Sequence, residues 1–134
     1  MRTALVLIGA ISILASCNTS AVYKKIADSD SLVIEFKDVR SNSIVKTVTT
    51  NTKVAINKII DFVDRQASEN YKCGYDGKLI FFSKGQAIQH IDFMKSDVNC
   101  RHFSFLLNDK LTSTIMTAEA AAFFDSLEQG RDFY

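Results

Sequence analysis

Four short apolar segments follow one another in the second half of the chain, each separated from the next by a few turn-forming residues. The segments run over 79–83, 87–94, 100–107 and 111–116, and between them lie Lys84-Gly85, residues 95–99 and Asn108-Asp109-Lys110. Short segments rich in β-branched and aromatic residues, bounded by Gly, Asn and Asp, are typical of strands joined by tight turns. The sequence therefore predicts an antiparallel meander of four strands.

The first half of the chain combines a predicted hairpin with a predicted amphipathic helix. Apolar and polar residues alternate over 32–37, residues 38–43 are mostly polar, and β-branched residues return from residue 44, which is the pattern of two strands and a turn. Apolar side chains then recur at the i, i+3, i+4 and i+7 positions of a helix, namely Ile56, Ile59, Ile60 and Val63. This spacing gives the helix one apolar face, with which it can cover a sheet.

A second helix is predicted near the end of the chain. Thr117 is a suitable N-cap, Gly130 is placed to end the helix, and four apolar residues between them share one face: Ala120, Phe123, Phe124 and Leu127. The expected order of elements is β-β-α-β-β-β-β-α. It indicates an α+β domain with a single antiparallel sheet and two helices on one face. This order is similar to the helix-grip and TATA-binding-protein-like topologies, a likeness of element order that implies no function.

The first sixteen residues have the composition of an export signal. Met1-Arg2 is a positive start, and an apolar run with small residues at its end follows. The run is shorter than the ~20 residues that a membrane-spanning helix needs. Leu14-Ala15-Ser16-Cys17 resembles the lipobox of bacterial lipoproteins. The resemblance implies that residues 1–16 are removed and that acylated Cys17 anchors the mature chain in the lipid bilayer. The alternatives are an ordinary signal peptide, or a tethered helix, with a chance cysteine.

The residues after Cys17 divide into a predicted tether and a predicted domain. Residues 17–30 are mostly polar and are expected to form a flexible, lipid-anchored tether, and residues 31–130 form the domain. Asn18 resembles the residue that follows the cysteine in outer-membrane lipoproteins, which implies an outer-membrane location facing the periplasm. Two further cysteines in an exported chain, Cys73 and Cys100, are expected to form a disulfide. Closing this loop would stabilise the fold by roughly 3.5 kcal/mol.

The charge balance bears on the class of partner. Sixteen Lys and Arg residues stand against fifteen Asp and Glu residues, and one of the basic residues, Arg2, lies in the leader, so the mature part carries no net charge. A nucleic-acid-binding protein would be expected to show a basic patch. We therefore predict no nucleic-acid partner.

Two histidines and two cysteines could be imagined as a zinc site: His90, His102, Cys73 and Cys100. The competing interpretation, two polar histidines beside a disulfide, is favoured because the chain has no close ligand pair such as C-x-x-C. Ser104, His90 and Asp92 could form a catalytic triad, but nothing in the sequence places the serine on a strained turn. The sequence therefore predicts no enzyme, no metal and no cofactor.

The adjacent Phe81 and Phe82 point to opposite faces of their strand, so one of them lies either under a second layer or in an exposed apolar patch that marks a partner surface. The segment from Cys73-Gly74-Tyr75-Asp76-Gly77 to Cys100-Arg101-His102-Phe103 resembles small uncharacterised bacterial lipoproteins, which implies no mechanism. The leading hypothesis is a non-catalytic binding module for an envelope protein. The alternatives are an inhibitor of an envelope-attacking hydrolase, because Tyr71-Lys72-Cys73 faintly resembles the start of C-type lysozyme inhibitors, and a carrier of small apolar ligands.

Overall fold

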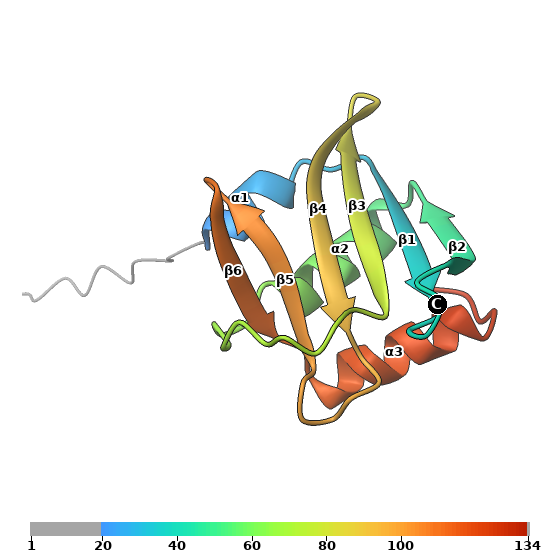
Figure 1. Cartoon of the computed structure of the whole chain (residues 1–134). Coiled ribbons are helices and arrows are strands. Elements are labelled where there is room, and N and C mark those ends of the chain that lie inside the picture. Colours follow the sequence, from blue (N-terminus) through green and yellow to red (C-terminus); the bar gives the residue numbers. More distant parts are fainter. Residues whose placement is uncertain (1–19, 134) are drawn as a thin grey trace, which may run out of the picture.

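The computed structural model describes residues 20–133, which form one sheet of six strands and three helices (Figure 1). In chain order the elements are α1 (Ala21–Ile26), β1 (Ser31–Lys37), β2 (Ile44–Thr50), α2 (Lys53–Val63), β3 (Gly77–Ser83), β4 (Gln86–Met94), β5 (His102–Leu107), β6 (Lys110–Ile115) and α3 (Ala118–Glu128). The predicted leader, Cys17 and the start of the predicted tether lie outside the described residues.

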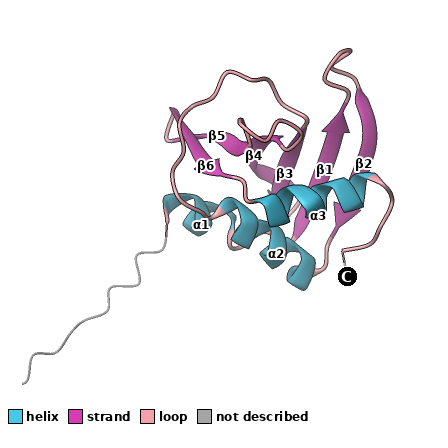
Figure 2. Cartoon of the chain, turned by 90° about the horizontal axis from the view of Figure 1, so that it is seen from below, coloured by secondary structure: helices cyan, strands magenta, loops and turns pink. Residues whose placement is uncertain are grey.

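The sheet has the strand order β2-β1-β3-β4-β5-β6, and every neighbouring pair is antiparallel. Strands β3 to β6 follow one another in space as they do in sequence, which confirms the predicted meander. All three helices lie on the same side of the sheet (Figure 2). The predicted α+β class, with a single antiparallel sheet and helices on one face, is therefore confirmed, although residues 20–133 form three helices rather than two.

The core lies between the sheet and the helices and is rich in phenylalanine. Alternate residues of β1 are buried, as the alternating sequence predicts, and their partners on β3 are buried on the same face. The ring of Phe124 on α3 stacks on Phe93 of β4 at a centroid distance of 4.8 Å and meets Phe103 of β5 edge-on at 6.0 Å. Aromatic pairs in these arrangements add to the stabilisation that burial gives. The predicted apolar faces of both long helices are thus the faces that pack on the sheet.

The prediction of a flexible tether is wrong from Ser20 onward. Residues 21–26 form α1, and Val22 and Ile26 are buried in the core. The Ser20 hydroxyl caps the helix by accepting a hydrogen bond from the backbone N–H of Tyr23 at 3.1 Å, and it also bonds the Asp64 carboxylate. Two apolar residues four positions apart are one turn of an amphipathic helix, a signal too short to recognise in a polar segment. The folded domain therefore begins about ten residues before its predicted start.

Two of the predicted turns are confirmed in detail. Lys84 and Gly85 have φ values of 51° and 77°, and Asn108 and Asp109 have φ values of 50° and 63°. Positive φ at both central residues defines the type I′ turn, whose twist matches that of the flanking strands. The connection between β4 and β5 is longer than predicted, because β5 begins at His102 and Cys100 remains in the loop.

Gly77 is required by the packing of the core. A Cβ atom on this residue would lie 2.3 Å from the carbonyl oxygen of Glu35 and 2.3 Å from the ring of Phe93. The Phe93 ring thus occupies the space that a side chain at position 77 would need. This arrangement explains the small residue at the start of a strand that is otherwise rich in large apolar residues.

Candidate functional site

The face of the sheet away from the helices, which we call the open face, is partly covered by one loop. This crossing loop (residues 66–76) runs from the edge of β6 across the sheet to the start of β3 (Figure 1). It begins as an extra strand-like segment, because Ser68 N–H donates to the Ser113 carbonyl and Ile115 N–H donates to the Gln66 carbonyl, both at 2.9 Å. The loop is therefore bonded to the sheet by its backbone and leaves the opposite half of the open face uncovered.

The crossing loop is also fixed by the cysteine pair predicted from the sequence. The structure places Cys73 and Cys100 at disulfide distance, with their Cα atoms 6.4 Å apart. Cys73 lies in the crossing loop and Cys100 lies in the β4–β5 loop, so the bond joins two loops at the same end of the sheet. The structure thus confirms that the two cysteines lie close enough to form the predicted disulfide.

The crossing loop buries His102 completely. The rings of Tyr71 and Tyr75 lie on the imidazole at centroid distances of 5.1 Å and 5.8 Å. The Nδ1 atom is 2.6 Å from the Cys100 carbonyl oxygen, which can only accept, so we assign the proton to Nδ1. The Nε2 atom has no hydrogen-bond partner among residues 20–133. His102 is therefore a buried residue of the loop–sheet contact.

The four residues considered as zinc ligands, His90, His102, Cys73 and Cys100, do not form one cluster. His90 is exposed on the open face, whereas His102 is buried under the crossing loop. Within residues 20–133, the group of potential ligands that lie close enough to share an ion is Cys73, Asp97 and Cys100, and its two sulfur atoms are at disulfide distance from each other. A thiolate ligand needs a free sulfur, so this group does not offer a metal site.

A hollow of about 350 Å³ opens on the uncovered half of the face, where β4 and β5 separate. These strands pair through three residues each, Asp92 with Ser104, Phe93 with Phe103 and Met94 with His102, and then diverge (Figure 1). Polar and apolar side chains line the hollow, among them Lys25 of α1, Tyr75, Ile88, His90, Asp92, Ser104, Leu106 and Leu111.

Gln89 bridges the strands at the hollow. Its Nε2 atom donates to the Leu106 carbonyl on β5 at 3.1 Å and to the His90 carbonyl on its own strand at 3.0 Å. Two carbonyl acceptors fix the orientation of the amide, because a carbonyl cannot donate. The Oε1 atom is consequently left buried without a partner in the described part of the chain. A side-chain amide thus takes the place of backbone pairing where the strands diverge.

The three residues of the imagined triad line this hollow together. Asp92 and Ser104 are cross-strand neighbours, and His90 lies two residues before Asp92 on the same face. Among the described residues, however, no hydrogen bond joins any two of the three. Ser104 lies in the middle of a regular strand, and a nucleophile of this type is usually presented on a sharp turn. The arrangement is that of a polar wall in a surface hollow.

The structure does not place an exposed apolar patch at Phe81 and Phe82. Phe81 is fully buried in the core, and Phe82 on the opposite face is half-buried. The large apolar side chains that are exposed on the β5–β6 part of the open face are Leu106, Leu111 and Ile115. Leu106 and Leu111 form a cross-strand pair at the edge of the hollow. Their exposure was not recognised from the sequence because Leu106-Leu107 continues an apolar strand.

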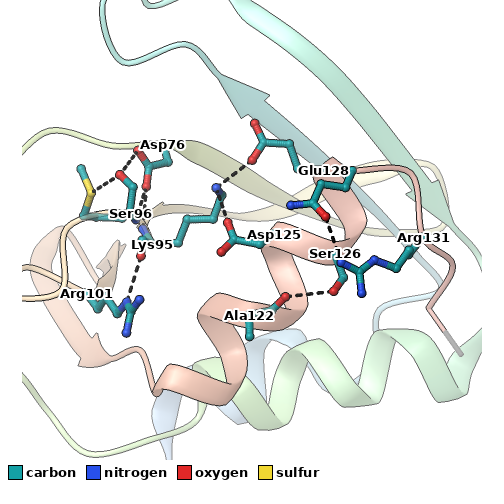
Figure 3. A network of polar contacts seen from close by, with 11 residues as sticks. Asp76, Lys95, Ser96, Arg101, Ala122, Asp125, Ser126, Glu128 and Arg131 are labelled. Carbon is teal, nitrogen blue, oxygen red and sulfur yellow. Dashed lines mark hydrogen bonds and ion pairs between the residues drawn. The ribbon is translucent and has the colours of Figure 1, made fainter.

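A polar network at the other end of the sheet was also missed (Figure 3). The Asp76 carboxylate accepts hydrogen bonds from the backbone N–H groups of Lys95 and Ser96 at 2.7 Å, and from the Ser96 hydroxyl at 3.0 Å. The Lys95 ammonium lies 2.7 Å from both Asp125 and Glu128 of α3. Burial alone would lower the pKa of Lys95, but these hydrogen bonds and charges outweigh it and raise the pKa. The network fixes the β4–β5 loop to α3.

Comparison of the chain with protein-family models, curated proteins and solved structures finds no match. Within residues 20–133, no helix has the length and apolar character needed to cross a membrane.

Proposed function

We propose that the chain is an exported lipoprotein, anchored through acylated Cys17 in the outer membrane and facing the periplasm, whose domain is a non-catalytic binding module for an envelope protein. The lipobox resemblance supports the anchor. The proximity of Cys73 and Cys100 agrees with an oxidising compartment, because stable disulfides are typical of exported proteins. The open face is the proposed contact surface.

The observation that carries the proposal is the hollow on the open face. The helices of the described residues pack on the opposite face, and α1 reaches the hollow through Lys25, so residues 20–133 leave the hollow open, with exposed Leu106 and Leu111 at its edge. His90, Asp92 and Ser104 on its wall offer donors and acceptors. Apolar anchors beside a few polar groups are the usual composition of an interface centre. The proposed partner therefore inserts an apolar side chain between β4 and β5.

A comparison of two matched variants tests this proposal. The chain starting at residue 17 with Cys17→Ser is immobilised and exposed to detergent-solubilised envelope, and retained proteins are identified by mass spectrometry. Leu106→Glu places a charge at the hollow, and Val39→Glu places the same charge at an equally exposed position, 59% against 57%, outside the hollow. We expect Leu106→Glu to lower retention of the partner at least tenfold and Val39→Glu to leave it unchanged.

The other outcomes separate the alternative functions. Equal retention by both variants would refute the open face as the contact surface. A retained muramidase whose rate falls in the presence of the domain would support the inhibitor hypothesis, and lipid retained without protein would support the carrier hypothesis. The carrier hypothesis has less support, because phenylalanine rings occupy the space between the helices and the sheet.

We also infer a likeness to helix-grip and TATA-binding-protein-like topologies. It is supported by the order of the elements after α1, by the antiparallel sheet and by the position of α2 and α3 on one face. The additional α1 departs from the expected order. This likeness concerns topology and adds nothing to the proposed activity.

A further inference from the structure

The distance between the proposed anchor and the folded domain is short. Ser20 already belongs to the domain, since its hydroxyl caps α1 and bonds Asp64. Three peptide links separate Cys17 from Ser20, and three residues of fully extended chain span at most about 10 Å. If Cys17 carries the lipid, as proposed above, the surface around Ser20 must lie within about that distance of the headgroups.

The surface around Ser20 has the chemistry of a headgroup contact. Tyr23, Lys24 and Lys25 are exposed on α1, Lys25 on the side of the helix that also borders the hollow, and Arg65 is exposed next to Ser20. We call these four residues the anchor-side surface. The nearest carboxylate, that of Asp64, is bonded to the Ser20 hydroxyl. Exposed acidic residues at the margin are Asp28 and Asp30 after the helix and Asp61, whose carbonyl accepts from Arg65. The surface therefore carries three basic groups and an aromatic ring on the side of the domain where the chain enters it.

We propose that the anchor-side surface rests on the membrane and binds anionic phospholipid headgroups, so that the domain is held against the bilayer in one orientation. This inference depends on the proposed anchor at Cys17. Two physical effects support it. Basic groups near an anionic surface gain attraction within a Debye length of about 8–10 Å. A tyrosine places its ring at the interface while its hydroxyl remains in water.

The attraction has a predictable size and salt dependence. Each lysine close to an anionic bilayer favours the docked state by a factor of about five. Removing the charges of Lys24 and Lys25 should therefore lower the ratio of docked to undocked domain roughly 30-fold, and reversing them should lower it further. The same ratio should fall at high salt, because the interaction acts between solvent-exposed charges.

The test uses a single thiol and a single fluorophore. With Cys73 and Cys100 joined, Cys17 is the free cysteine, and the chain contains no tryptophan. The chain from residue 17 is coupled through Cys17 to a maleimide phospholipid in vesicles of phosphatidylethanolamine and phosphatidylglycerol that contain brominated lipid. Tyr23→Trp reports the anchor-side surface, and Val98→Trp is the matched control on the β4–β5 loop, at the opposite end of β5 from α1 (Figure 1).

We expect brominated lipid to quench the tryptophan of Tyr23→Trp several times more strongly than that of Val98→Trp. The added changes Lys24→Glu and Lys25→Glu should abolish the difference, whereas Lys72→Glu in the crossing loop should leave it. Circular dichroism of each variant verifies the fold. Equal quenching of the two tryptophans, on protein that remains attached to the vesicles, would overturn the docking proposal and leave the anchor intact.

A separate measurement addresses the anchor. The intact mass of the protein purified from bacterial membranes shows whether Cys17 carries acyl chains. An unmodified Cys17 would overturn the proposed lipoprotein, and it would not alter the vesicle result. The failure of one proposal is thus distinguishable from the failure of the other.

Discussion

Replacing Asp76 by alanine should cost a large part of the stability of the domain. The carboxylate accepts two backbone N–H groups at 2.7 Å and one hydroxyl at 3.0 Å, and the side chain lies buried. In the alanine variant the N–H groups of Lys95 and Ser96 lose their acceptor. Each of the two unsatisfied donors costs about 1–2 kcal/mol and the lost hydroxyl bond about 1 kcal/mol, so we expect a loss of roughly 3–5 kcal/mol. Domains of this size are stable by about 5–15 kcal/mol.

Urea unfolding followed by circular dichroism, with the disulfide intact, measures this loss. Asp76→Asn is the informative companion, because its amide oxygen can still accept both N–H groups and its amide nitrogen can donate to the Ser96 hydroxyl. We expect Asp76→Asn to cost about 1 kcal/mol, and the exposed control Asp132→Ala to change stability by less than about 0.5 kcal/mol. If Asp76→Asn were as unstable as Asp76→Ala, the argument from hydrogen-bond acceptors would be refuted and the charge itself would be the cause.

Three further changes test other parts of the structure. Gly77→Ala should lower the unfolding free energy by at least about 3 kcal/mol, since the new methyl group would lie 2.3 Å from the Glu35 carbonyl oxygen; unchanged urea unfolding would contradict this packing. The double variant Cys73→Ser, Cys100→Ser should lose about 3 kcal/mol in the same assay, and an equal loss on reduction of the wild type is the control. Lys95→Met should be less stable than the wild type at neutral pH. Because the folded-state pKa of Lys95 is raised, its contribution is complete below the unfolded pKa near 10.5 and is lost as pH rises through the folded value. The stability difference should therefore be constant between about pH 7 and 9 and shrink above pH 10.5, and a difference that grew with rising pH would refute the assignment.

The elements of the fold were predictable wherever a local pattern was repeated. Alternation in β1, helical spacing in α2 and α3, and the two-residue turns each follow from side-chain periodicity or backbone conformation, and each is found at its predicted place. Helix α1 could not be predicted, because its two apolar residues, Val22 and Ile26, are buried only by packing against parts of the chain that are distant in sequence. Long-range packing of this kind leaves no periodic signal in a single sequence.

The candidate site was only partly predictable for a related reason. The cysteine pair was predictable because two further cysteines in an exported chain favour a disulfide. The common face of His90 and Asp92 was predictable because side chains alternate along a strand. The hollow depends on where β4 and β5 stop pairing, at the end of these strands away from the β4–β5 loop, where the Gln89 amide takes the place of backbone pairing. Strand periodicity shows which residues share a face but does not show where two neighbouring strands separate.

The short pairing between β4 and β5 also bears on how the domain unfolds. Three residue pairs join these strands, whereas six join β5 to β6 and seven join β3 to β4. The sheet can thus be regarded as two cooperative units, β2-β1-β3-β4 and β5-β6, with the boundary at the hollow. The crossing loop and the Cys73–Cys100 pair span this boundary on the open face. Amide hydrogen exchange in the reduced protein should therefore accelerate first in β5 and β6, and a partner seated in the hollow would slow it again by holding the two units together.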